Sequence, residues 1–185
     1  MAAPIFEALS ERVLIYDGAM GTQIQAANLT ADDFILKSEH SLSPSLKAAA
    51  QRLDGKNLEG CNELLNITRP EVIEAIHTRY LEAGSDLVET NTFGTTSIVL
   101  AEYQIEELVY DLSLAAGQIA RRAADKVSTT QRPRFVVGAI GPGTKLVSLG
   151  QTTFTELENT YCDSFRGLLD GGTILFIRMY VTMLP

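Results

Sequence analysis

The chain has 185 residues, 45% of them hydrophobic, and its 15 Lys and Arg against 23 Asp and Glu give a formal net charge of −8. This length suits one globular domain, since a complete barrel of eight strand–helix units takes about 250 residues. The acid excess, without a basic run, argues against nucleic acid and anionic membranes as partners. No apolar stretch approaches the roughly 18 residues of a membrane span, and the two cysteines, Cys61 and Cys162, make no disulfide framework. We therefore expect a cytoplasmic protein whose ligands are small molecules.

The predicted elements begin with a strand over residues 13–17. Residues 18–66 are poorly periodic and indicate loop with short helical turns. A connection of this length is more often a functional rim than a linker. Thr68 and Glu71 then have the spacing of a capping box, which predicts a helix that begins there and ends at Gly84.

A second strand is expected over residues 86–90. An apolar stripe with a spacing of 3.6 residues predicts a helix over about 105–127, and an apolar run predicts a buried strand over 135–140. A helix over about 154–170 and a strand over 174–177 follow. The apolar face of that last helix would be formed by Phe154, Leu157, Tyr161, Phe165 and Leu168. This alternation predicts an α/β fold with a parallel sheet, and its four strands are half the number in an eight-stranded (β/α)₈ barrel.

Two of the predicted strands run directly into polar, glycine-containing loops, Asp17-Gly18-Ala19-Met20-Gly21-Thr22 and Glu89-Thr90-Asn91-Thr92-Phe93-Gly94. Active sites of parallel α/β proteins lie at the carboxyl ends of strands, so these loops are candidates for a site rim. Asp17 can accept hydrogen bonds from an ammonium group, and the glycines allow close approach of the backbone to a ligand. The alternatives are an ordinary Asp-Gly turn and a set of exposed loop side chains.

Other chemically active residue types favour simpler interpretations. Cys61 is expected to be a half-buried structural thiol, because no histidine is near it in sequence, and Cys162 is expected within a helix. His77 is expected on the outer flank of its helix, in a solvated or hydrogen-bonded position. An unrelated α/β enzyme that uses Asp17 and Glu89 as acid and base remains an alternative.

Five motifs together resemble the homocysteine-binding domain of cobalamin-dependent methionine synthases, a homocysteine S-methyltransferase domain. They are Asp17-Gly18-Ala19-Met20-Gly21-Thr22, Gly60-Cys61-Asn62-Glu63, Thr68-Arg69-Pro70-Glu71-Val72-Ile73, Ala83-Gly84-Ser85-Asp86 and Glu89-Thr90-Asn91-Thr92-Phe93. The resemblance covers about residues 11–173. We therefore expect residues 1–185 to form one partial barrel domain, with a divergent tail over 174–185. The resemblance implies the first half of a (β/α)₈ barrel, with homocysteine as substrate and Asp17, Gly18, Thr90 and Asn91 as its contacts.

The resemblance also implies cofactors. In the family three cysteine thiolates hold zinc, the substrate sulfur takes the fourth position, and methylcobalamin on another module donates the methyl group. Neither Cys61 nor Cys162 lies in a motif that resembles the zinc-binding cysteines of the family, and the tail from Arg178 does not resemble the family. We therefore expect a truncated or frame-shifted chain that lacks the zinc ligands and is inactive alone. Its partners would be the folate- and cobalamin-binding modules of the full-length parent. The alternative is a non-catalytic fragment that pairs through the open edges of its first and fourth strands.

Overall fold

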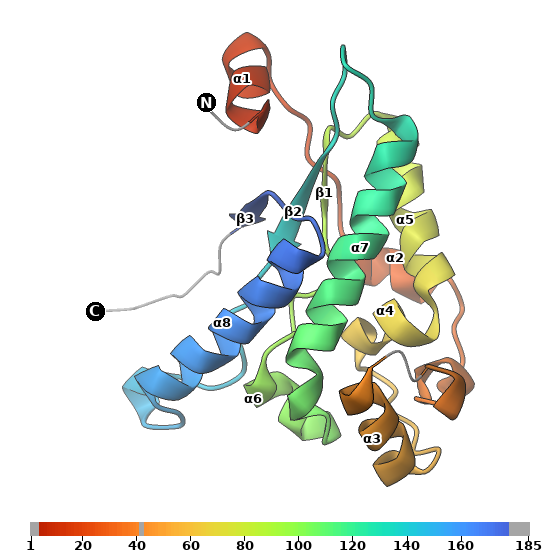
Figure 1. Cartoon of the computed structure of the whole chain (residues 1–185), viewed down its shortest axis with the longest axis vertical. Coiled ribbons are helices and arrows are strands. Elements are labelled where there is room, and N and C mark those ends of the chain that lie inside the picture. The colour runs from red at the N-terminus through yellow and green to blue at the C-terminus, as the bar shows by residue number, and fades with distance from the viewer. Residues whose placement is uncertain (1–3, 41–42, 178–185) are drawn as a thin grey trace.

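The computed structural model describes residues 4–40 and 43–177 and has an α/β fold with a parallel sheet, as predicted (Figure 1). The strands are β1 (Leu87–Glu89), β2 (Phe135–Ala139) and β3 (Leu175–Ile177), in the order β1-β2-β3. Leu87 is in register with Phe135, and Val137 with Leu175. Most of the predicted divergent tail, residues 178–185, lies outside the described residues.

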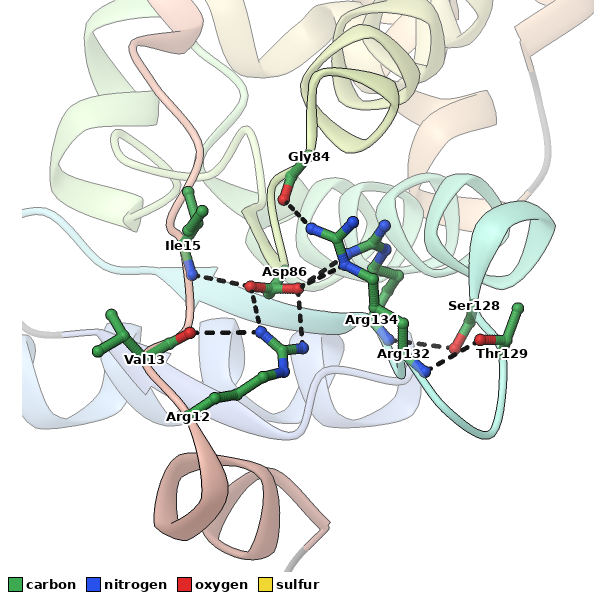
Figure 2. A network of polar contacts seen from close by, with 9 residues as sticks. All are labelled: Arg12, Val13, Ile15, Gly84, Asp86, Ser128, Thr129, Arg132 and Arg134. Carbon is green, nitrogen blue, oxygen red and sulfur yellow. Dashed lines mark hydrogen bonds and ion pairs between the residues drawn. The ribbon is translucent and has the colours of Figure 1, made fainter.

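The strand predicted over residues 13–17 is wrong: this segment forms a single parallel bridge, between Tyr16 and Leu87. The Ile15 amide donates to the Asp86 carboxylate at 3.0 Å, a side-chain partner in place of a strand neighbour (Figure 2). Val13 and Ile15 are also 86% and 56% exposed, so little apolar burial holds the segment in a regular strand. The described sheet therefore has three strands instead of four.

Three helices lie side by side along the sheet in Figure 1: α5 (Pro70–Ala83), α7 (Val109–Val127) and α8 (Phe154–Asp170). Val88 and Val136 on the adjoining strands pack against Leu81 of α5 and Ala120 of α7. The stripe predicted for the second helix is confirmed, because all of its residues are buried. They are Ile105, Leu108, Leu112, Ala116, Ile119 and Ala123. The regular helix begins only at Val109, after a 3₁₀ turn over Glu106–Leu108.

The side chains that alternate with Val88 and Val136 point to the opposite face of the sheet. There Leu87, Phe135 and Val137 form a cluster with Ile5 and Ala8 of α1 (Pro4–Glu11). The amino-terminal helix therefore packs against part of the face that the three large helices leave free, and in Figure 1 it lies beyond the amino ends of the strands. None of the described helices is long and apolar enough to cross a membrane.

The contact between α7 and α8 is formed largely by small residues, which the apolar pattern of α8 did not indicate. The buried positions of α8 are Thr160, Ser164, Gly167 and Leu168, whereas Phe154 is 72% exposed. A Cβ added at Gly167 would lie 2.6 Å from the Tyr110 carbonyl oxygen of α7. The helix backbones approach so closely that large apolar side chains are excluded from the centre of this interface.

The described part of the region predicted as loop with short helical turns contains three helices and several 3₁₀ turns. Its elements are α2 (Met20–Ala26), Ala31–Phe34, Ser38–His40, α3 (Pro44–Leu53), Asn62–Leu64 and α4 (Leu65–Thr68). Helix α3 was missed although its signal is local: the Ser43 hydroxyl accepts from the Leu46 amide, and Pro44 occupies the first helical position. After β1 come α6 (Ser97–Leu100) and a 3₁₀ turn over Ala101–Tyr103, and after β2 a turn over Val147–Leu149.

Two predictions around α5 are wrong. Thr68 and Glu71 do not form a capping box, because Thr68 is the last residue of α4 and its hydroxyl donates to the Leu64 carbonyl oxygen. Pro70 starts α5 without a side-chain cap, and Gly84 ends it with a positive φ of 116°, as predicted. His77 is fully buried instead of solvated, and neither ring nitrogen has a hydrogen-bond partner.

Candidate active site at the carboxyl ends of the strands

A cavity of about 530 Å³ opens where β1 and the segment before α2 end. The four residues predicted to contact substrate, Asp17, Gly18, Thr90 and Asn91, all line it. Segments separated by more than 70 residues are brought together because Asp17 donates its amide to the Leu87 carbonyl oxygen at 3.1 Å. The two polar loops found in the sequence therefore border one cavity.

Asp17 has an unusual environment for a carboxylate. Its Oδ2 atom accepts from the Glu89 amide at 2.9 Å, whereas Oδ1 is buried and has no hydrogen-bond partner. Burial, followed by the nearby charge of Glu89, raises the pKa of Asp17 to about 7. A buried carboxyl oxygen without a donor, on a residue that lines a cavity, is a favourable partner for a donor on a ligand.

Gly18 packs closely against the Tyr80 side chain beneath the cavity. A Cβ at this position would lie 2.9 Å from the Tyr80 hydroxyl oxygen, and that hydroxyl donates to the Ala19 carbonyl oxygen at 3.1 Å. Helix α5 therefore holds the first residues of the loop in place through Tyr80. Gly18 allows this contact by having no side chain.

The threonines after β1 connect the ends of two strands. The Thr92 hydroxyl donates to the Ala139 carbonyl oxygen at 2.7 Å, and the Ala139 amide donates to the Thr90 hydroxyl at 3.0 Å. The two hydroxyl oxygens are 2.6 Å apart, so Thr90 gives its proton to Thr92, whose own proton is already donated. Thr90 thus holds the cavity wall in shape, and its hydroxyl has no proton left for a substrate.

Asn91 is similarly committed to the scaffold. Its Nδ2 donates to the Asn62 carbonyl oxygen at 2.8 Å and to Asn66 Oδ1 at 3.2 Å, while Asn66 Nδ2 donates to the Asn91 carbonyl oxygen at 2.8 Å. Since both amide protons of Asn91 are donated within the protein, the side chain can offer a substrate only its acceptor oxygen.

Two more carboxylates line the cavity: Glu89, which the sequence suggested only as an acid or base of an unrelated enzyme, and Glu63, to which it gave no role. Glu63 accepts from the Gly94 amide at 2.7 Å, and burial raises the pKa of both Glu63 and Glu89. A Cβ at Gly94 would lie 2.6 Å from Glu63 Oε1, so the residue type of Gly94 is set by this bond. The signal for Glu63 was its place in the Gly60-Cys61-Asn62-Glu63 motif. Together with Asp17, these residues make the cavity rich in acceptors and negative charge.

The surroundings of the two cysteines do not suit metal binding. Cys61 is fully buried rather than half-buried, in a core cluster with Leu58 and Leu64. Burial, and then the charge of Glu63, raise the pKa of the Cys61 thiol to about 12. Cys162 lies on the exposed side of α8. Among residues 4–40 and 43–177, no three His, Cys, Asp or Glu side chains are arranged to hold a metal ion.

A parallel sheet flanked by helices, with a polar cavity at the carboxyl ends of its strands, is the arrangement of α/β enzymes. The family model for homocysteine S-methyltransferases matches residues 14–182, and the chain belongs to this family.

Curated relatives agree with this assignment, and solved structures agree with the fold. The chain is 47% identical over 168 residues to a methionine synthase of Mycobacterium leprae and 46% identical to one of Mycobacterium tuberculosis. These matches cover 91% of the chain but only 12% of either relative, so the chain spans about an eighth of their length. The fold is similar to that of the homocysteine methyltransferase MmuM of Escherichia coli. The TM-scores are 0.63 for its oxidised form and 0.62 for its metallated form. The identities there are 20% and 19%, over 94% of this chain and 55% and 56% of MmuM.

Proposed function

We propose that this chain forms the amino-acid-binding side of a homocysteine pocket, within the first half of a (β/α)₈ barrel. The observation that carries the proposal is that Asp17 lines the cavity and that its buried Oδ1 atom has no hydrogen-bond partner. The substrate ammonium group would donate to this oxygen. The family assignment supports homocysteine as the amino acid.

The rest of the cavity supports a cationic group at this end of the ligand. Asn91 offers only an acceptor oxygen, and Glu63 and Glu89 add carboxylates. Thr90 and Gly18 act in this proposal through the shape of the wall and the position of the backbone. A pocket with several acceptors and no unused side-chain proton on Thr90 or Asn91 favours a donor such as ammonium.

Titration of homocysteine into wild-type protein and the Asp17→Asn variant tests the ammonium contact. We expect binding to weaken at least about tenfold in the variant, since a hydrogen bond to a charged group contributes about 1.5–3 kcal/mol. Asp32→Asn, at an exposed position, is the matched control. As a second probe, 4-mercaptobutanoic acid has the thiol and carboxylate but no ammonium group. Equal affinity of the wild type for both ligands would contradict the proposal.

The residues of this chain do not fit the three-thiolate zinc site of the family. The sequence contains two cysteines, one of them in the core with a raised pKa, and they lie in separate parts of the fold. We therefore propose that the 185-residue polypeptide alone binds homocysteine without transferring a methyl group. Stoichiometric zinc in the purified polypeptide, or methionine formation from methylcobalamin, would overturn this proposal.

Zinc, cobalamin and the modules that carry the folate and cobalamin belong, in this proposal, to full-length methionine synthases of the kind the chain resembles. The relatives' much greater length supports the presence of such modules in them. Both cysteines are unpaired, which suits the reducing cytoplasm in which we place the protein.

The second candidate is an interaction module that pairs through its sheet edges. It is favoured by the exposed Val13 and Ile15, which lie on the segment bordering β1. Edge positions with exposed apolar side chains are templates for association with another chain. Gel filtration with light scattering separates the candidates, because a clean monomer at all concentrations argues against edge pairing.

A further inference from the structure

At the amino end of β1, opposite the cavity, three arginines surround one carboxylate, in an arrangement we call the Asp86 network (Figure 2). It consists of Asp86, Arg12, Arg132 and Arg134. Arg12 binds Asp86 with both terminal nitrogens, at 2.7 and 2.9 Å, and Arg134 donates Nη1 at 2.8 Å. Asp86 is fully buried and also accepts from the Ile15 amide.

Positive charge exceeds negative charge in this network. Arg12 alone neutralises Asp86, Arg134 adds a second positive charge, and the bond from Arg132 Nε to Asp86 is longer than theirs, at 3.3 Å. Glu11 contributes to the field at Arg12, more weakly than Asp86 does. Even with Glu11 included, three guanidinium groups face two carboxylates. Burial, followed by the charge of Arg132, lowers the pKa of Arg134, as expected for an arginine beside an uncompensated cation.

One strong donor of the network has no acceptor. Arg134 is 8% exposed, and its Nε atom is buried without a hydrogen-bond partner. Arg132 stands beside it with 47% of its side chain exposed and is attached elsewhere through Nη2 to the Gly84 carbonyl oxygen at 2.7 Å. A buried unpartnered arginine nitrogen next to a surplus, solvent-accessible guanidinium is the donor set that recognises a carboxylate or phosphate group.

We propose that the Asp86 network is a binding site for a small oxyanion, a carboxylate or phosphate group, held by Arg132 and Arg134 at the amino end of β1. The site is separate from the cavity, because Asp86 precedes β1 and the cavity begins at Glu89, where β1 ends. Arg12 stays with Asp86 and connects α1 to the strand, so the ligand occupies only donors that the fold does not use.

The test measures the melting temperature of the full chain at constant ionic strength, as phosphate or succinate replaces chloride. We expect a saturable rise with at least one of these anions, and the anion that produces it identifies the ligand chemistry. Arg132→Gln should raise the half-saturating concentration about tenfold, because it removes a charge-assisted contact. Arg122→Gln, an exposed arginine paired with Glu74 on the helical side, is the matched control and should leave it unchanged.

A second measurement does not depend on the stability of a variant. The side-chain Nε–Hε resonance of Arg134 in the wild-type chain should shift on addition of the same anion, with the same half-saturating concentration. The proposal is overturned if neither anion produces a saturable effect, or if Arg132→Gln and Arg122→Gln respond alike.

Discussion

At Asp17, the negative charge that would bind an ammonium group lowers the stability of the fold. Its pKa is raised from 3.8 to about 7, so folding favours the protonated carboxyl. The stability that this preference contributes is complete below about pH 4 and is lost as the pH rises to about 7. The ionised form that binds an ammonium group is therefore the form that the fold tolerates least.

We predict that Asp17→Asn raises the free energy of unfolding at pH 8 by about 2 kcal/mol, a value reduced from the full shift because the carboxyl is partly exposed. Urea denaturation at pH 4 and pH 8 measures this, and the difference between variant and wild type should nearly vanish at pH 4. Asp32→Asn controls for loss of charge alone. A variant less stable than wild type at pH 8 would contradict the conclusion that the ionised Asp17 carboxylate destabilises the fold.

His77 is a fully buried histidine without hydrogen-bond partners. Both nitrogens are buried without partners, and burial lowers its pKa from 6.5 to about 4. A depressed histidine pKa means that the neutral ring stabilises the fold above about pH 6.5 and that this contribution is lost as the pH falls toward 4. Folding therefore excludes the proton from His77.

For His77→Leu we predict a flatter stability profile between pH 7 and pH 4, with an advantage over wild type of about 3 kcal/mol at the acid end. Denaturation curves over this pH range test it. His40→Leu, which alters a half-exposed histidine in a 3₁₀ turn, is the comparison. Parallel profiles for wild type and His77→Leu would show that His77 is hydrogen-bonded or solvated after all.

At the scale of elements, α7 and α8 pack backbone against backbone through small residues. Gly167 lies against the Tyr110 carbonyl oxygen and Ser113, and Gly117 against Gly171. The spacing between these helices is therefore set by backbone contact.

We predict that Gly167→Ala lowers the free energy of unfolding by about 1–3 kcal/mol, as overpacking does. Gly21→Ala is the matched control, because it also lies in a helix but an added Cβ meets nothing within 4 Å. Alanine there should leave stability unchanged or raise it by about 0.5–1 kcal/mol. Chemical denaturation measures the free energy of unfolding of both variants. Equal changes in the two variants would argue against close packing between α7 and α8.

Much of the fold was predictable from local pattern. The alternation of elements, the buried stripe of α7 and the end of α5 at Gly84 all follow from periodicity and backbone preference. The strand at 13–17 failed for a non-local reason, since Asp86, 71 residues away, takes the Ile15 amide. The apolar face of α8 was only partly correct: Leu168 is buried and Phe154 is exposed, because packing against α7 selects small residues that apolar periodicity does not detect.

The location of the candidate site was predictable from the sequence, but the roles of its individual residues were less so. Strand ends followed by polar loops indicated the cavity that Asp17, Gly18, Thr90 and Asn91 line. The hydrogen bonds of Thr90 and Asn91 to the scaffold depend on partners in β2 and in the 61–66 region, which sequence spacing does not reveal. Their contact with substrate remains a prediction.

At the scale of the whole molecule, the edge of the sheet next to β1 is the surface that association would use. We predict concentration-dependent self-association of the wild-type chain and its loss in Ile15→Lys, because a charged side chain on an edge opposes pairing. Sedimentation velocity over a range of concentrations measures it. Leu149→Lys, which alters an apolar side chain that is 67% exposed on the turn after β2, should not change the association. Equal loss in both variants would indicate nonspecific apolar contact.

The short strand β1 separates two clusters of opposite sign. Surplus guanidinium charge lies at its start, and three carboxylates lie at its end, about 10 Å away for a strand of three residues. The two ends of β1 therefore differ in the sign of the charge that surrounds them. These local charges favour a cation at the cavity and an anion at the opposite end of β1, so a ligand with one charged group would distinguish the two ends by the sign of that group.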